Sequence, residues 1–208
     1  MNARLVKKLL PPLIPYITVG LGLLVFHNAW LAILGYHAGI VAVTALSKPG
    51  VSLKQAYKSR RYRVLLMAAL FGAGGGLLLN ILWPLLSVPG DVDSYIRSIG
   101  LNEQTWPVFL AYFIVVNPLL EEYYWRSCLA GAGKGLELND LLFSGYHLLV
   151  LAGQMTIIWL IVVFFALTMA AWLWRQMNRL NEGLLASTVS HITADITVIL
   201  TIYTLTAK

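Results

Sequence analysis

Residues 64–87 read VLLMAALFGAGGGLLLNILWPLLS and contain no charged side chain. A transmembrane helix needs about 20 mostly apolar residues to cross the hydrocarbon core of a bilayer. This stretch therefore predicts a membrane-spanning helix. Gly72 and Gly76 have the small-xxx-small spacing that lets a second helix approach closely, so we expect this span to pack tightly against a neighbour.

The composition of the whole chain supports the same interpretation. Of the 208 residues, 59% are hydrophobic and 12% are charged, whereas soluble domains average roughly 45–50% apolar and about 25% charged residues. So little polar surface argues against an ordinary soluble enzyme and against a disordered chain. Cys128 is the only cysteine, which excludes an intrachain disulfide and a cysteine-based metal site.

Other apolar segments predict further spans. Residues 11–46 are long for one helix and short for two, and basic residues lie at both of their ends. The positive-inside rule then favours a hairpin of two short spans that turns near Asn28. The other predicted spans are residues 105–130, 139–153, 155–174 and 183–205, and Asn139 is the expected N-cap of the second of these.

The predicted fold class is all-α, a polytopic membrane helix bundle of about seven spans. We expect residues 1–208 to form one integral membrane domain. Residues 1–63 would form the N-terminal hairpin and a basic loop, and residues 64–208 the catalytic bundle.

The distribution of charge predicts how the bundle is oriented. The net charge is +6, and the lysines and arginines gather in loops that would share one side, with Arg97 in the opposite, external loop 88–104. The positive-inside rule places the basic side in the cytoplasm, most simply that of a bacterial inner membrane. Arg175 and Arg179 are expected in a cytoplasmic loop. The basic stretch 54–63 predicts contact with anionic membrane lipid and no nucleic-acid partner.

Ionisable side chains lie inside three of the predicted spans, where burial is costly and function is the default explanation. At 1.5 Å per residue, Glu121 lies about 15 Å from the cytoplasmic end of its span, and His147 and His191 each lie about 12 Å from theirs. We therefore expect a carboxylate and two imidazoles at one level, around a polar cavity open to the cytoplasm. Phe143 lies one turn before His147 and is expected to pack against it.

Local spacing predicts pairs within this group. Glu122 and Arg126 are four residues apart on one helical face, a good geometry for an ion pair. Glu121 is rotated by about 100° from Glu122 and faces elsewhere. His191 and Asp195 are also four residues apart, so Asp195 can set the tautomer of the imidazole or bind the same water or metal.

Glutamate and histidine around one water molecule are typical of hydrolases. Glutamate can deprotonate the water, and histidine can hold it or donate to a developing oxyanion. Two histidines and a carboxylate also match the ligand count of a catalytic zinc site. The sequence is therefore compatible with two mechanisms: one with a divalent metal such as zinc bound by Glu121, His147 and His191, and one without a metal. The HExxH and GxSxG motifs are absent from the sequence.

Three motifs occur in order on separate predicted spans. They are Glu121-Glu122-Tyr-Tyr-Trp-Arg126 (EExxxR), Phe143-Ser-Gly-Tyr-His147 (FxxxH) and His191-Ile-Thr-Ala-Asp195 (HxxxN/D). In this order they resemble the motifs of the CAAX-protease and bacteriocin-processing (CPBP, or Abi) family of intramembrane proteases. Together with the Asn117-Pro118 pair that precedes the first motif and also looks familial, the motifs cover residues 117–195, less than half of the chain.

The resemblance implies an endopeptidase that hydrolyses a peptide bond in a membrane-anchored peptide or protein. It implies that Glu121 activates water with help from His147, and that His191 and residue 195 stabilise the oxyanion or orient the water. Arg126 would hold the glutamate pair. Prenyl-directed members usually have asparagine where this chain has Asp195, and an ionised aspartate cannot donate to an oxyanion. This departure weakens a prenyl-specific interpretation.

Two other functions fit part of the pattern. A proton-coupled transporter would use the buried Glu, His and Asp side chains as a relay, but its expected signs are repeated, interrupted helices in both halves, and here the polar residues lie in the C-terminal half. A non-catalytic membrane scaffold would use the same residues to hold helices together.

Overall fold

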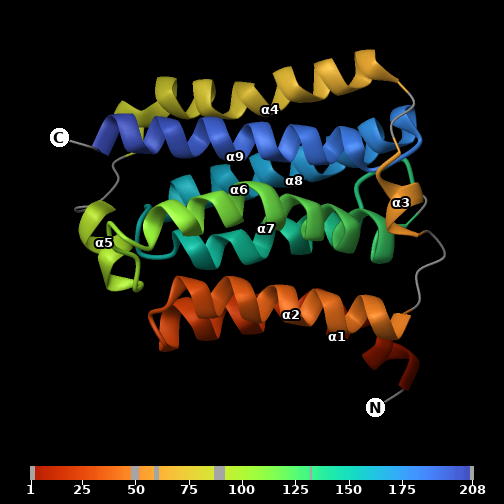
Figure 1. Ribbon diagram of the computed structural model, residues 1–208, viewed down its shortest axis with the longest axis horizontal. Coiled ribbons are helices and arrows are strands. Elements are labelled where there is room, and N and C mark those ends of the chain that lie inside the picture. The colour runs from red at the N-terminus through yellow and green to blue at the C-terminus, as the bar shows by residue number, and fades with distance from the viewer. Residues whose placement is uncertain (1–2, 48–51, 59–60, 87–91, 132, 207–208) are drawn as a thin grey trace.

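The computed structural model describes residues 3–47, 52–58, 61–86, 92–131 and 133–206. Within these ranges the chain is helical and contains no strand, which confirms the all-α prediction (Figure 1). The α-helices are α1 (Ala3–Gly20), α2 (Ala29–Ser47), α3 (Leu53–Ala56), α4 (Tyr62–Leu82), α5 (Val92–Ser98), α6 (Trp106–Tyr123), α7 (Leu138–Leu151), α8 (Ile157–Asn181) and α9 (Leu185–Thr206). Short π-helical segments extend α1 (Leu21–Val25) and α6 (Tyr124–Cys128).

Four helical segments are long and apolar enough to cross a membrane. They are Ala29–Leu46, Tyr62–Leu85, Ile157–Asn181 and Leu185–Leu205, and shorter apolar helices cover Leu10–Val25 and Leu138–Leu151. Large apolar side chains point outward from these helices; Leu66 and Phe165, for example, are each 61% exposed. Exposed apolar surface on this scale is costly in water, and four helices have the length and composition of membrane spans, so the structure indicates a membrane protein.

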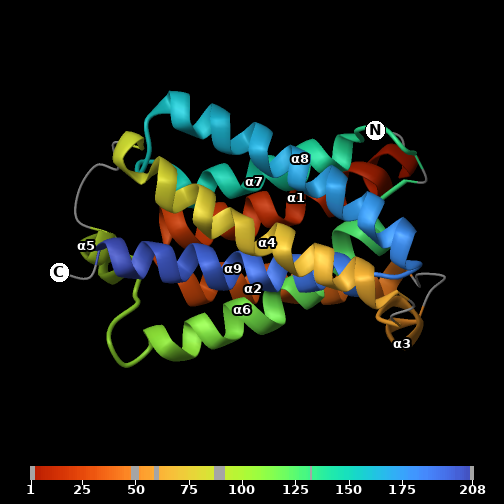
Figure 2. The same cartoon turned by 90° about the horizontal axis from the view of Figure 1, so that it is seen from above.

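The helices form three layers. The α1–α2 hairpin makes one face, α6 and α7 lie in the middle, and α4 and α9 make the opposite face (Figure 1). Seen from above, α6 and α8 flank α9 on opposite sides (Figure 2). The middle of the bundle is therefore enclosed on all sides, and α6, α7 and α9 meet there.

The predicted turn near Asn28 is present, and the helices on either side of it form a hairpin in which α2 alone has the length of a full span. Helix α1 and its π-helical extension end before a short turn at residues 26–28, where His27 adopts a left-handed conformation with φ of 48°. The side chain of Asn28 accepts a hydrogen bond from the backbone N–H of Leu31 at 2.9 Å and so caps the start of α2. A Cβ atom at Gly22 would lie 2.4 Å from the Cα atom of Ala32, so only glycine allows the two helices this close.

The close packing predicted for Gly72 and Gly76 is also confirmed, and the partner is α9. A Cβ atom at Gly72 would lie 2.0 Å from the carbonyl oxygen of Ser190, and one at Gly76 would lie 2.5 Å from Thr197. Thr193 donates from its hydroxyl to the carbonyl of Ala69 at 3.1 Å across the same contact. This contact holds α9 at a defined depth beside α4.

Two local predictions are wrong. Helix α8 continues to Asn181, so Arg175 and Arg179 lie in its last turns and not in a loop. Helix α7 begins at Leu138 with Glu137 as its N-cap, and not with Asn139. Arg175 is buried because it pairs with Asp140, which lets a charged residue continue the helix.

The basic segment after α2 packs against the turn between α8 and α9. The backbone N–H of Leu184 donates to the carbonyl of Ala56 at 2.7 Å, and Arg61 lies 3.6 Å from Glu182 in an exposed ion pair. Two parts of the predicted loops lie outside the described residues: residues 59–60 of the lipid anchor 54–63, and residues 88–91 of the external loop 88–104. The rest of the external loop includes α5.

Candidate active site

Helix α6 carries the centre of the polar cluster, and it changes its geometry directly after the two glutamates. Glu121 and Glu122 are fully buried, and the chain continues as the π-helical segment that contains Arg126. Such wide turns inside helices occur frequently at functional sites. Arg126 Nε lies 3.5 Å from Glu122 Oε2, so the predicted ion pair is formed, and only 2% of the Arg126 side chain is exposed.

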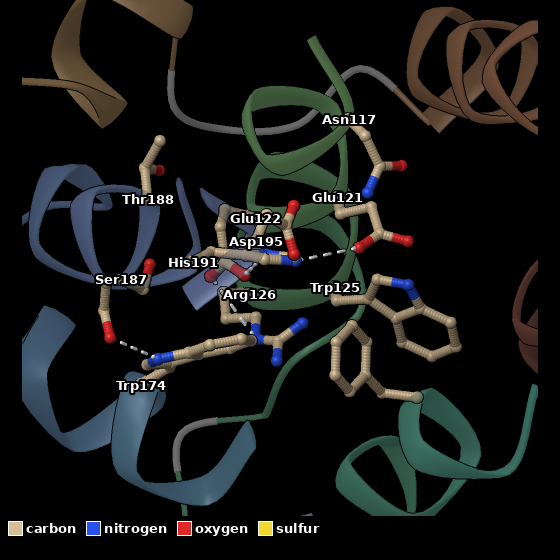
Figure 3. Close-up of polar contacts among 12 residues, drawn as sticks. Asn117, Glu121, Glu122, Trp125, Arg126, Trp174, Ser187, Thr188, His191 and Asp195 are labelled. Atoms are coloured by element: carbon tan, nitrogen blue, oxygen red, sulfur yellow. Dashed lines mark hydrogen bonds and ion pairs between the residues drawn. The ribbon is translucent and has the colours of Figure 1, made fainter. Parts of the chain in front are cut away.

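His191 of α9 lies between carboxylates. Its Nδ1 atom is 3.0 Å from Glu122 Oε1, and its Nε2 atom is 3.6 Å from Glu121 Oε2 and 3.8 Å from Asp195 Oδ1 (Figure 3). Because a carboxylate accepts, Nδ1 carries the proton that it shares with Glu122. The structure thus brings the first and third sequence motifs together, from helices separated by about 70 residues.

His147 of α7 reaches Glu121 through Tyr146. The Tyr146 hydroxyl donates to Glu121 Oε1 and also lies 3.2 Å from His147 Nε2. His147 Nδ1 is 2.8 Å from the carbonyl oxygen of Phe143, which only accepts, so Nδ1 is protonated and Nε2 faces the tyrosine. One phenolic proton therefore serves two acceptors, and Tyr146 connects the glutamate to the imidazole.

Aromatic rings enclose the charged groups. Trp174 stacks on His191 with 4.6 Å between ring centroids, and Phe143 packs on His147 at the same distance, as the one-turn spacing predicts. The guanidinium of Arg126 lies 4.0 Å from the centre of the Phe143 ring and 5.1 Å from that of Trp174. The negative faces of these rings stabilise the arginine, and in such apolar surroundings the enclosed charges interact more strongly than in water.

Several buried carboxylate oxygens of the cluster accept no hydrogen bond from the protein, although two of them lie 3.5–3.6 Å from Arg126 and His191 in ion pairs. These are Glu121 Oε2, Glu122 Oε2 and Asp195 Oδ2. An oxygen buried without a partner is costly, and such groups in a polar cluster are the natural acceptors for a water molecule or a substrate N–H. The cluster therefore has the acceptors that water activation requires, next to an imidazole that can carry a positive charge.

The metal site that the sequence left open is not assembled. No group of three or more His, Cys, Asp or Glu side chains among the described residues is placed to hold a metal ion. His147 directs Nδ1 to the Phe143 carbonyl and Nε2 to Tyr146, so Glu121, His147 and His191 do not offer three lone pairs to one point. A zinc ion on these three residues does not fit this arrangement.

Sequence patterns missed several residues that shape the site. Tyr146 is the most important, because it is the direct link between Glu121 and His147. Tyr57, from the basic segment, donates to the carbonyl of Leu119 on α6, and burial raises the pKa of this phenol well above its ordinary value, so it remains a donor. No spacing within one helix reveals either contact, since both join segments far apart in the sequence.

The comparisons with known proteins found no match for this chain among protein-family models, curated proteins or solved structures.

Proposed function

We propose that this protein is an intramembrane endopeptidase of the CPBP type. The observation that carries the proposal is the position of His191 between Glu121 and Glu122, with Tyr146 joining Glu121 to His147. A base, a chargeable imidazole and a second imidazole from three helices meet in an enclosed polar cluster. Packing alone does not require three carboxylates around one buried imidazole, whereas hydrolysis uses them.

In this mechanism Glu121 is the general base. Its Oε2 atom takes a proton from water, and the resulting hydroxide attacks the carbonyl carbon of the scissile peptide bond. The proton then passes to the leaving nitrogen as the C–N bond breaks, which yields a new carboxylate and a new amine. Tyr146 lets His147 share this proton, because its hydroxyl contacts both Glu121 and His147.

His191 stabilises the negative charge that develops on the carbonyl oxygen. Glu122 holds Nδ1, which leaves Nε2 to donate once the ring is protonated. Asp195 lies 3.8 Å from Nε2 and supports the positive ring through charge. Arg126 balances Glu122, so that Glu122 orients His191 without being protonated itself.

The proposal includes an orientation in the membrane. The cytoplasmic side would carry the basic segment 54–63, the end of α8 and the π-helical end of α6 (Tyr124–Cys128). Seven helical segments would cross or enter a bacterial inner membrane. The apolar helices Leu10–Val25 and α7 are shorter than a full span, which a bundle accommodates by local thinning of the bilayer. The substrate would be a membrane-anchored peptide or protein that reaches the cluster from the cytoplasmic side.

The decisive experiment compares Glu121→Gln with a matched control, Glu103→Gln. Glu103 is exposed and lies in the turn before α6, so its change removes the same charge away from the cluster. Membrane peptides that accumulate in cells with Glu121→Gln, identified by mass spectrometry, are then given to the purified proteins in detergent. We expect wild type and Glu103→Gln to cleave them, and Glu121→Gln to be slower by about 100-fold or more. Equal turnover of all three would reject the proposal, and so would a proton-coupled uptake activity without any cleavage.

A further inference from the structure

Two neighbouring side chains of α2 reach the part of α6 that carries Glu121, and the proposed mechanism gives them no role. Tyr36 and His37 are only 2% and 4% exposed. The indole Nε1 of Trp125 donates to the Tyr36 hydroxyl at 2.7 Å, and His37 Nε2 lies 3.1 Å from Asn117 Oδ1. These two hydrogen bonds, the α2–α6 contacts, join the N-terminal hairpin to the helix at the centre of the polar cluster.

The α2–α6 contacts lie about one turn on either side of Glu121. Asn117 is four residues before the glutamate and Trp125 is four residues after it, a spacing that places side chains on one face of a helix. Figure 3 shows the three side chains on the same side of α6, with Glu121 between the other two. The charge of Glu121 acts on both Tyr36 and His37. Helix α2 thus holds the turn that presents the glutamate from both ends.

Helix α6 by itself gives this turn limited support. Pro118 has no backbone N–H, so one hydrogen bond of the α-helix is missing just before the glutamates. Regular α-helical geometry ends at Tyr123, and the π-helical segment begins at Tyr124. Residues 119–123 therefore lie between two interruptions of the α-helical pattern. Contacts with other helices then decide where Glu121 points.

The His37 ring is held in one orientation. Its Nδ1 atom lies 2.7 Å from the Tyr112 hydroxyl, and its Nε2 atom faces Asn117 Oδ1. Because a carbonyl oxygen only accepts, Nε2 carries the proton and Nδ1 accepts from the tyrosine, which uses both nitrogens of a neutral imidazole. The Trp125 indole can only donate, so the direction of its hydrogen bond to Tyr36 is fixed as well. Such directional contacts fix the rotation of a helix, whereas apolar packing alone fills space.

We propose that Tyr36 and His37 are positioning residues for the general base Glu121. The inference rests on the proposed peptidase function and adds the N-terminal hairpin to its machinery. Both residues act through their partners on α6. A misplacement of about 1 Å in an active site can cost about 100-fold in rate. Loss of either contact should therefore lower kcat and leave KM nearly unchanged, because the groups that bind the substrate remain.

The test measures turnover by the full-length protein in detergent. The probe is the membrane peptide that accumulates with Glu121→Gln, made with a fluorophore and a quencher on either side of the cleaved bond. Tyr36→Phe keeps the ring and removes only the hydroxyl that accepts from Trp125. His37→Leu removes the donor to Asn117, and His37→Gln restores an N–H at a similar distance. We expect kcat to fall about tenfold in Tyr36→Phe and His37→Leu, with KM within about twofold of wild type, and His37→Gln to recover most of the loss.

The matched control is Tyr16→Phe. Tyr16 of α1 donates to the carbonyl of Leu142 on α7 at 2.7 Å, so this variant also removes one phenolic hydroxyl that docks the hairpin, but not against α6. Its kcat should stay within about twofold of wild type. An equal loss of kcat in Tyr16→Phe and Tyr36→Phe would overturn the inference, since general docking of the hairpin would then be the cause. It would also be overturned if His37→Gln were as slow as His37→Leu, because that requires the imidazole itself.

A second measurement does not depend on cleavage. Hydrogen exchange of the backbone, followed by mass spectrometry, reports local opening of α6. Residues 119–125 should exchange about tenfold faster in Tyr36→Phe/His37→Leu than in wild type or Tyr16→Phe, since two hydrogen bonds that hold this turn are lost. If His37→Leu does not fold, Tyr36→Phe alone decides by both measurements.

The two measurements separate this inference from the proposed function. Faster exchange without cleavage by any of the proteins would reject the peptidase and leave the hold of α2 on the Glu121 turn standing. Cleavage with wild-type kcat in Tyr36→Phe and His37→Leu would reject the positioning role and leave the peptidase standing. Unchanged exchange in the double variant would overturn the inference in either case.

Discussion

Replacing Arg126 by methionine tests whether the buried ion pair holds the cluster together. The two charges are almost completely enclosed, and Arg126 Nε lies 3.5 Å from Glu122 Oε2. Removing one partner of a buried pair costs about 3–5 kcal/mol in soluble proteins, because the other charge is left without compensation. We expect the lower end, about 3 kcal/mol, since His191 remains 3.0 Å from Glu122.

This free energy corresponds to a measurable shift. In a protein of this size, 1 kcal/mol changes the Tm by about 2–4 °C, so Arg126→Met should lower the Tm by about 6–12 °C. The measurement is thermal unfolding of the purified protein in one detergent at a fixed scan rate, because unfolding of membrane proteins is often irreversible. Methionine keeps the apolar stem of the side chain, so the loss reports the charged guanidinium and its contacts with Glu122 and the Phe143 and Trp174 rings.

The chain contains a matched control for this variant. Arg97 and Asp93 are also an arginine and a carboxylate four residues apart, at 3.9 Å, but they are 62% and 63% exposed. Exposed pairs are worth about 0–1 kcal/mol, so Arg97→Met should change the Tm by less than about 3 °C. The double variant Glu122→Gln/Arg126→Met removes the uncompensated charge and should recover at least half of the loss. Equal Tm values for Arg126→Met and Arg97→Met, or no recovery in the double variant, would refute the reasoning.

Three further predictions address the proton relay, Asp195 and the contact between α4 and α9. Tyr146→Phe should lower peptide turnover by about 10–100-fold with little change in KM, because the ring stays and only the link to Glu121 is lost; unchanged turnover would exclude the relay. Asp195→Asn should keep turnover within about tenfold of wild type, since two other carboxylates face His191; a loss beyond 100-fold would make its charge essential. Gly72→Ala should lower the Tm clearly, because the added Cβ atom would meet the backbone of α9. Gly74→Ala is the control and should leave the Tm unchanged, because a Cβ atom there would have no atom within 4 Å. Similar Tm values for the two variants would contradict the packing.

The sequence by itself determined the features that depend on a single segment. Uninterrupted apolar runs specify helices, since only a helix satisfies its own backbone in lipid, and α4 follows directly from residues 64–87. The turn near Asn28 and the close approach at Gly72 are equally local, because they depend on a short polar break and on the absence of side chains. The pair Glu122–Arg126 follows from helical periodicity alone.

Helix ends were less predictable where a charge is buried. Arg175 marks the end of a span in the sequence, because an unpaired arginine is costly in a membrane. In the folded chain Asp140 of α7 neutralises it, and α8 continues to Asn181. The partner lies 35 residues away, and nothing in the local pattern announces it.

Only the tertiary structure decided which polar groups meet and in what geometry. Depth along each helix placed Glu121, His147 and His191 at a similar level, but depth does not specify how each helix is rotated about its axis. That rotation is set by packing, such as the contact of α9 with Gly72, and it turns His191 between two glutamates. It also places Tyr146 between Glu121 and His147, which replaces a three-ligand metal site with a hydrogen-bonded chain. A rotation of one residue, about 100°, would separate these groups, which is why their chemistry could not be determined from the order of the motifs alone.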